Sequence, residues 1–432
     1  MTQVIFSDTT QGIEKAVAEI FEQAGGAASL LKSSRDVYLK PNAIDLKKHV
    51  FTNPDVLHAV IRHFQQAGAK TVYVIENCTQ GNITRLVFEA TGMTRVCRET
   101  GAIPVYLDET GAVPVYLEGL QSFIDISDFV HDRLIEKKDE NLYVSLPKLK
   151  THSMSQVTLS IKNQFGLVHH HSRVADHNFR LHQKFADIYR LLRPDFVVVD
   201  GLIATNHGHY TAEKFEDECI LPMNCLIGGT DPLAVDIAAA AFLGFKIDDV
   251  AHLKLSAETG LSPATDFDAV EILNRELFET RKKDLTHQLL ENFPPELCIL
   301  RGKERCCMEG CRRNTESVVE ILYSDHKGRG DFTILMGKDI DAAEVDRIAK
   351  PPVHLAGSCA IQDYGREMLR RFGKKQVTFS QGCNNLPATV YALCRHMKVN
   401  PISLANMNPV KSLALLARAR LNHSRAMIPP LF

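Results

Sequence analysis

Residues 37–75 have the sequence VYLKPNAIDLKKHVFTNPDVLHAVIRHFQQAGAKTVYVI. A short β-branched run ends at Leu39, Asn53 begins a helical pattern that continues to about Gln66, and a second β-branched run occupies 71–75. This strand–helix–strand order is typical of parallel β-sheets that carry helices on their faces. The sequence therefore predicts an α/β fold.

The same alternation continues on both sides of this unit. Further strands are predicted at 142–145 and 196–199, and Asp231 caps an alanine-rich helix over 233–243. A charged and then proline-bearing segment at 274–295 indicates a connection between domains. We expect a mostly parallel sheet flanked by helices, followed by a second, smaller α/β domain.

The predicted domain boundary lies near Glu296, which gives a first domain of residues 1–295 and a second of 296–432. In the second domain we expect three strands, each followed by a helix. The predicted strands are 332–336, 353–356 and 376–380, and the predicted helices are 342–348, 361–372 and 386–397.

Composition narrows the classes of partner. A formal charge of −2, with 24% charged residues, gives no basic excess for nucleic acid or for an anionic membrane surface. The N-terminus lacks a signal-peptide pattern, and no apolar run has membrane-spanning length, so we expect a cytoplasmic protein. Motifs for nucleotide triphosphatases, ordinary dinucleotide dehydrogenases and α/β-hydrolases are missing.

Eleven cysteines in a reducing compartment point to a metal site, a redox role or burial. Cys359 and Cys383 follow two predicted neighbouring strands, whose carboxyl ends should meet in one crevice. The run 306–311, CCMEGC, lies ahead of these strands and can supply more thiolates.

Clustered thiolates suit a 4Fe–4S cluster, because its irons prefer sulfur ligands and nearby glycines let the backbone approach. We expect the ligands Cys307, Cys311, Cys359 and Cys383, with Cys306 as the alternate. Structural zinc and unliganded thiols are the competing interpretations. Cys394 lies inside a predicted helix and is assigned to the core.

Basic and amide side chains follow the predicted strands of the first domain. Together they predict a pocket for a carboxylate or phosphate, since lysine supplies charge and asparagine directional hydrogen bonds. The predicted ligand-binding residues are Lys40, Asn42, Asn77, Lys148, Asn163 and Asp200, and the predicted catalytic residues are His152, Lys150 and Lys162. Ordinary solvated lysines are the alternative for each single position.

Histidines offer a second metal site. Either His207 and His209 or the run His169–His171 could bind a divalent ion through imidazole nitrogens. A histidine-rich loop without a metal is the competing interpretation.

Several phrases in the first domain resemble the family catalogued as domain of unknown function 362. They are Lys40-Pro41-Asn42, Pro147-Lys148-Leu149-Lys150-Thr151-His152, Lys162-Asn163 with Gly166, Val199-Asp200-Gly201 and Asp231-Pro232-Leu233-Ala234-Val235-Asp236. The resemblance covers about residues 35–245 and implies an association with iron–sulfur modules. The sequence departs from the family pattern at 203–209, IATNHGH, and its cysteines do not form a ferredoxin-type run.

These observations lead to three functional hypotheses. The first is an iron–sulfur protein with an anionic small-molecule site, acting as an oxidoreductase or lyase through redox or cluster-assisted chemistry. The second is a non-catalytic carrier or maturation factor that passes a cluster or electrons to a redox partner protein. The third is a metal-dependent racemase or epimerase.

Overall fold

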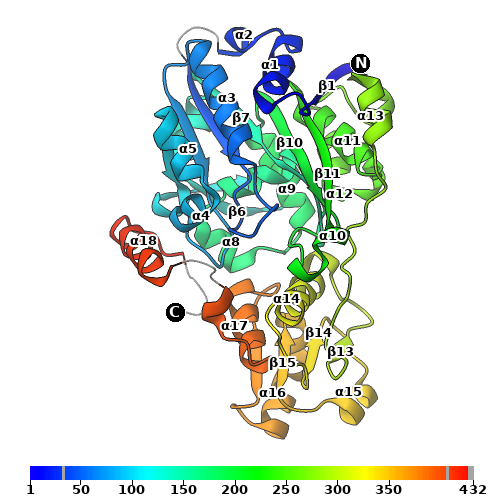
Figure 1. Cartoon of the computed structure of the whole chain (residues 1–432). Helices are drawn as coiled ribbons and strands as arrows, with labels where there is room; N and C mark the ends of the chain where they lie inside the picture. The colour runs from blue at the N-terminus through cyan, green and yellow to red at the C-terminus, as the bar shows by residue number, and fades with distance from the viewer. Residues whose placement is uncertain (32–34, 405–407, 427–432) are drawn as a thin grey trace.

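The computed structural model describes residues 1–31, 35–404 and 408–426. A ten-stranded sheet and a separate four-stranded sheet form the centres of two domains (Figure 1). Helices cover the large, mostly parallel sheet, and all strands of the small sheet are parallel. The predicted fold class is confirmed.

The main path of the large sheet contains every strand that the sequence predicted for the first domain. Its order is β12 (Val270–Leu273), β1 (Thr2–Asp8), β11 (Ile220–Gly229), β10 (Phe196–Thr205), β7 (Asn141–Leu146), β2 (Asp36–Pro41), β3 (Val72–Glu76) and β4 (Ile103–Tyr106). From β10 to β4 neighbouring strands are parallel, whereas β11 is antiparallel to both of its neighbours.

Side chains alternate along each strand and point to opposite faces of the large sheet. Both faces are buried, because helices cover each of them. Val37 and Leu39 belong to one core, and Tyr38 between them belongs to the other. The first core is closed by α1 (Ile13–Gln23), α3 (Pro54–Gln66) and α5 (Met93–Thr100). The second is closed by α9 (Leu181–Leu191), α11 (Pro232–Phe242) and α12 (Ala251–Ala257).

The segment that was predicted as a loop after β7 is itself a strand, β8 (Lys148–His152). It pairs with β10 and with β9 (Gln156–Thr158), so Lys148, Lys150 and His152 fall on one side of the strand. At about 3.3 Å per residue these three side chains are spread along the strand and reach different surroundings.

The small sheet has four strands where the sequence predicted three. Its order is β13 (Cys298–Arg301), β14 (Thr333–Met336), β15 (Val353–Ala356) and β16 (Val377–Ser380). The strand β13 was not predicted; it follows directly on the proline-bearing connection and ends in the charged residue Arg301. One face is covered by α14 (Arg313–Ser324) and α17 (Leu386–His396), the other by α15 (Ala342–Ile348) and α16 (Ser358–Phe372).

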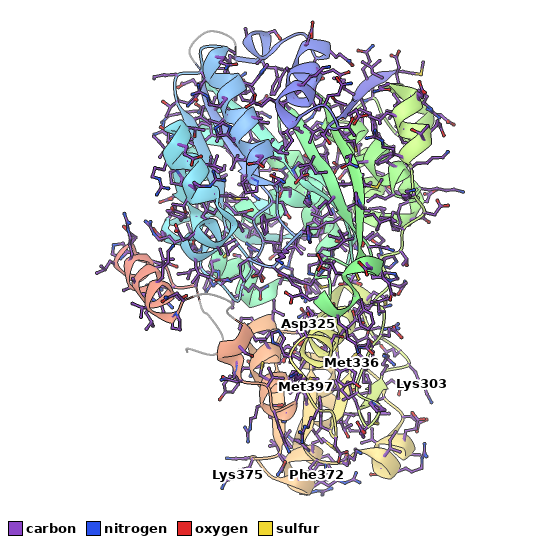
Figure 2. The ribbon with its side chains drawn as sticks, in the orientation of Figure 1. Lys303, Asp325, Met336, Phe372, Lys375 and Met397 are labelled. Atoms are coloured by element: carbon purple, nitrogen blue, oxygen red, sulfur yellow. The ribbon has the colours of Figure 1, made fainter. Side chains whose placement is uncertain are left out.

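Side-chain contacts join the two domains. Asp325, at the end of the second domain that faces the first (Figure 2), pairs with Lys47 at 2.8 Å and accepts hydrogen bonds from the backbone N–H groups of Glu213 and Lys214. In the described ranges no helix is both long and apolar enough to cross a membrane.

The last helix, α18 (Pro409–Leu421), leaves the second domain and packs on α4 (Thr84–Thr91) of the first (Figure 1). Its buried residues Leu416 and Ala419 form a small core with Leu86. The helix α18 therefore contacts the part of the chain built on the large sheet.

Replacing Leu416 by alanine should loosen this attachment. Leu416 is 6% exposed, and its truncation should cost about 2 kcal/mol of docking free energy. Limited proteolysis should then release the C-terminal helix faster, while the rest of the chain unfolds as before. Leu413 on the same helix is 55% exposed and provides the matched control, because its replacement by alanine removes little contact. Equal proteolysis of the two variants would contradict the packing described.

Candidate functional site

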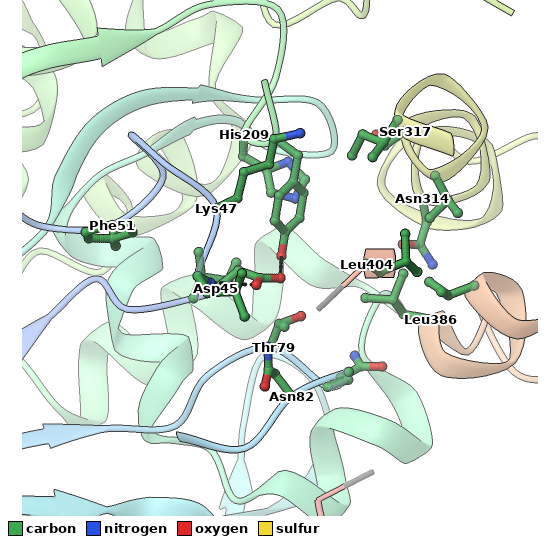
Figure 3. A pocket seen from close by; sticks show the side chains of 18 of the residues that line it. Asp45, Lys47, Phe51, Thr79, Asn82, His209, Asn314, Ser317, Leu386 and Leu404 are labelled. Atoms are coloured by element: carbon green, nitrogen blue, oxygen red, sulfur yellow. Dashed lines mark hydrogen bonds between the residues drawn. The ribbon is translucent and has the colours of Figure 1, made fainter. Parts of the chain in front are cut away.

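A cavity of about 810 Å³ lies between the two domains (Figure 3). Asp45, Thr79 and Asn82 belong to the first-domain wall, in the loops that follow β2 and β3. Asn314 on α14 and Leu386 on α17 lie across from them. The loops at the carboxyl ends of the parallel strands thus line the cavity, as is usual for ligand sites in α/β proteins.

A buried ion pair forms part of the first-domain wall. Lys40 Nζ lies 2.7 Å from Glu76 Oε1, and both side chains are almost completely buried. Asn163 Oδ1 accepts a hydrogen bond from Lys40 Nζ at 3.1 Å. A side chain on Gly166 would clash, since its Cβ would lie 2.5 Å from Glu76 Oε1 and 2.6 Å from Lys40 Nζ. The ion pair thus explains why an asparagine acceptor stands at position 163 and a glycine three residues later.

Lys162 lies on the short helix α7 (Ser160–Asn163), which lines the cavity. The carboxylate of Asp236 on α11 fixes the start of α7 by accepting hydrogen bonds from the backbone N–H groups of Ser160 and Ile161, at 2.8 and 2.7 Å. The Lys162 ammonium has no ion-pair or hydrogen-bond partner among the described residues. Lys162 Nζ lies 5.5 Å from the centroid of the Phe185 ring, in a cation–π contact.

Burial and neighbouring positive charge set the protonation of Lys162. Desolvation, followed by Arg173 and Lys40, lowers the pKa of Lys162 to about 7. The lysine in turn acts on the other groups that face it, and lowers the pKa of Lys150, His152, His177, His182, His209 and His252. Cations and neutral imidazoles thus surround this part of the cavity.

Two stacked imidazoles line the cavity near Lys162. The rings of His152 and His209 lie 3.7 Å apart and are nearly parallel. Burial holds the pKa of both well below the ordinary value, so both rings are neutral. His152 Nδ1 accepts a hydrogen bond from the backbone N–H of Met154 at 3.2 Å, and therefore carries its proton on Nε2.

His177 has the opposite arrangement. Its Nδ1 lies 2.5 Å from Asn178 Oδ1, and Asn178 Nδ2 donates to the backbone carbonyl of Cys383. The amide oxygen accepts, so His177 Nδ1 carries the proton and Nε2 keeps its lone pair. Burial lowers the pKa of His177 to about 3. The cavity therefore holds one imidazole that can donate through Nε2 and one that can accept.

Three amide oxygens in the cavity wall have no donor within the described part of the chain. They belong to Asn42, Asn77 and Gln80, all buried. The amide nitrogen of Asn42 donates to Asn163, and that of Asn77 to the carbonyl of Val168. A buried acceptor without a partner is costly, and each of these three oxygens is shielded from water by neighbouring atoms.

The structure brings six of the nine predicted ligand-binding and catalytic residues to the cavity. They are Lys40, Asn42, Asn77, His152, Lys162 and Asn163. The other three lie outside the lining that the described residues form. Lys148 pairs with Asp200 at 2.8 Å, and Lys150 Nζ donates to the backbone carbonyl of Val50. These three residues hold backbone segments together behind the site.

The candidate histidines for a second metal have separate partners. His207 Nδ1 lies 3.0 Å from the carbonyl oxygen of Gln288, whereas His209 stacks on His152. In the run 169–171, His169 caps α8 (His170–Asp176) and His171 is exposed. In the described ranges no three His, Cys, Asp or Glu side chains already form a metal-binding group.

The candidate cysteines lie in loops and helix ends at the carboxyl edge of the small sheet. A hydrogen bond between the thiols lowers the pKa of Cys306 and raises that of Cys311. Cys359 lies within electrostatic reach and raises the pKa of both Cys307 and Cys311. Cys359 sits in the first turn of α16, which begins at Ser358 and not at 361 as predicted.

The loop that carries Cys383 contacts the start of α16. The backbone N–H of Ser358 donates to the carbonyl of Gly382 at 2.8 Å, and the Gly382 N–H donates to the Ser358 hydroxyl at 3.0 Å. Cys311 is adjacent, since its Cβ lies 3.4 Å from where Gly357 would carry a side chain. Cys383 itself is exposed.

Fold and cavity define a two-domain α/β protein with a cavity where the domains meet. Residues 37–241 match the model of the family described as Domain of unknown function (DUF362). The predicted resemblance over about 35–245 is confirmed. Over 256 residues the chain is 28% identical to a thylakoid-associated protein of Synechocystis sp., an alignment that covers 56% of this chain and 74% of that protein.

Replacing Lys162 by methionine should stabilise the protein. Between about pH 7 and the ordinary lysine pKa of 10.5, the folded state binds fewer protons at Lys162 than the unfolded state. The free-energy cost of burying this lysine therefore falls as the pH rises. The variant should therefore gain on the order of 1–4 kcal/mol at neutral pH, and the gain should shrink toward pH 10. Urea unfolding across this range measures both effects. A destabilised variant would mean that Lys162 has a structural partner.

Proposed function

We propose that this protein binds a small hydroxylated molecule with a carboxylate or phosphate group in the interdomain cavity and acts on it there. The observation that carries the proposal is the Lys162 ammonium, which faces the cavity without a carboxylate partner in the described part of the chain. Unpaired buried ammonium groups are costly, and an anionic ligand would compensate the charge.

Charge and hydrogen bonding favour this class of ligand. Arg173 adds positive charge close to Lys162, while the nearby Glu76 is already paired with Lys40. The Nε2–H of His152 can donate a hydrogen bond to a ligand oxygen, and Nε2 of His177 can accept one from a ligand hydroxyl. The site thus combines an ammonium group with neutral hydrogen-bonding side chains.

Binding of inorganic phosphate or oxalate should weaken as the pH rises through about 7, because Lys162 loses its charge there. Isothermal titration calorimetry should show an affinity that falls about tenfold between about pH 6 and pH 9. A K162R variant should keep its affinity over this range, since arginine stays charged.

Two further variants test the same site. K162Q should lose about tenfold in affinity at about pH 6, where the lysine is charged. Lys48 lines the exposed side of the cavity, and K48Q should change binding little. Equal effects of both substitutions, or an unchanged pH profile in K162R, would count against an anion site at Lys162.

We also propose that Cys307, Cys311, Cys359 and Cys383 hold a 4Fe–4S cluster, with Cys306 as the alternate ligand. The contacts among the thiols and loops at the edge of the small sheet support this set. The soft thiolates would bind iron, and the cluster would supply electrons or a Lewis-acidic iron. The free thiols of all eleven cysteines suit a reducing compartment, and we propose a cytoplasmic location.

The cysteine loops also contact the cavity wall. Asn314, which lines the cavity, follows Cys311 by three residues, and Asn178 in the opposite wall donates to the carbonyl of Cys383. This proximity favours chemistry on a bound ligand, as an iron–sulfur oxidoreductase or lyase. The exposure of Cys383 favours the second candidate, a carrier that passes a cluster or electrons to a partner protein.

Anaerobic reconstitution should load about four irons and four sulfides per chain. The double variant C311S/C359S should lose most of this iron. Cys394 is buried inside α17 and is not among the proposed ligands, so C394A should retain the iron. Iron and sulfide analysis with electron paramagnetic resonance measures the outcome. Stoichiometric zinc in place of iron, or full iron loading of the double variant, would overturn the cluster proposal.

A further inference from the structure

We propose that Lys162 is a nucleophile that forms an imine with the carbonyl carbon of a small anionic ketone or aldehyde. This inference rests on the proposed anion site and goes further, because it names the reacting group of the substrate and a covalent step. Keto acids and phosphorylated carbonyl compounds share the required chemistry, which is a carbonyl carbon close to an anionic group.

The surroundings of Lys162 favour an amine over an ammonium. The side chain is partly buried, faces the Phe185 ring and has cations and neutral imidazoles around it. Desolvation beside another cation is a known way to activate a lysine for imine formation. With its pKa at about 7, about half of the Lys162 side chains are neutral at neutral pH. Lys48, exposed at the same cavity, has no such surroundings.

Fixed groups remain to hold the anion when Lys162 is neutral. The guanidinium of Arg173 is buried and donates to the backbone carbonyls of Asn77 and Cys78, at 2.6 and 2.7 Å. Arginine keeps its charge at neutral pH, and its Nε has no partner in the described ranges. When Lys162 is the neutral, attacking amine, Arg173 therefore remains as the charged group that can hold the anion.

The two imidazoles hydrogen-bond to the reacting groups. The neutral amine of Lys162 attacks the carbonyl carbon, a nitrogen–carbon bond forms, and the carbonyl π electrons move to the oxygen, which accepts a hydrogen bond from the Nε2–H of His152. The attacking nitrogen donates a hydrogen bond to Nε2 of His177, loses one proton to solvent as the oxygen takes one up, and gives the neutral carbinolamine. A further proton from solvent protonates the hydroxyl group, the carbon–oxygen bond breaks, water leaves, and the nitrogen lone pair forms the carbon–nitrogen double bond of the protonated imine. The sequence consumes no oxidant or reductant.

Reductive trapping tests this step on the full chain. The protein is incubated with pyruvate, glyoxylate or dihydroxyacetone phosphate and sodium cyanoborohydride, and peptides are analysed by mass spectrometry. At least one of the three should give a single adduct on Lys162. Labelling should speed up as the pH rises through about 7, because the neutral amine reacts. Lactate, which has the anion but no ketone, should protect, and acetone should not label.

The K162R variant separates the covalent step from anion binding. Arginine keeps the charge, so the variant should still bind phosphate but form no adduct at this position. Adducts spread equally over Lys48 and other exposed lysines would overturn the inference. Phosphate binding that depends on Lys162, without an adduct from any of the three compounds, would overturn the imine and leave the anion site standing. Absence of both the adduct and phosphate binding that depends on Lys162 would overturn the proposed function itself.

Discussion

The buried ion pair between Lys40 and Glu76 constrains the whole site. It lies where β2 and β3 end, and Glu76 also accepts from the backbone N–H of Ala43, which fixes the chain as it leaves β2. Asn163 brings α7 onto the same pair, and only glycine fits at position 166 beside it. Removing one partner of a buried pair leaves an uncompensated charge that costs several kcal/mol, roughly 3–5. The strand ends and α7 are therefore locked together.

Fold class was predictable because local signals and tertiary environment agree in the centre of the large sheet. The caps Asn53 and Asp231 accept hydrogen bonds at the starts of α3 and α11, as their positions predicted. Prediction failed where pairing partners decide the structure. The basic strand β8 has little β propensity and forms because β9 and β10 pair with it. The docking of α18 depends on a patch of α4 far away in sequence.

The site was predictable only in part, for the same reason. Lysine and asparagine after predicted strands identified Lys40, Asn42 and Asn77, since strand ends converge in any parallel sheet. Arg173 gave no such signal, because it lies on a helix between histidines and reaches the cavity through tertiary packing. The second-domain wall was also missed. Its residue Asn314 sits inside a helix that has no motif of its own.

The two walls of the cavity have different chemical characters. The first domain contributes the buried charges and imidazoles, which are coupled so tightly that a change in one alters the protonation of its neighbours. The second contributes the uncharged side chains of Asn314, Ser317 and Leu386, beside Asp325, which pairs with Lys47. Substitutions at the uncharged positions can reshape the space around a bound molecule and leave the titrating groups undisturbed. Ligand selectivity can therefore change among related proteins through substitutions in the second domain, while the charged and imidazole side chains of the first domain stay the same.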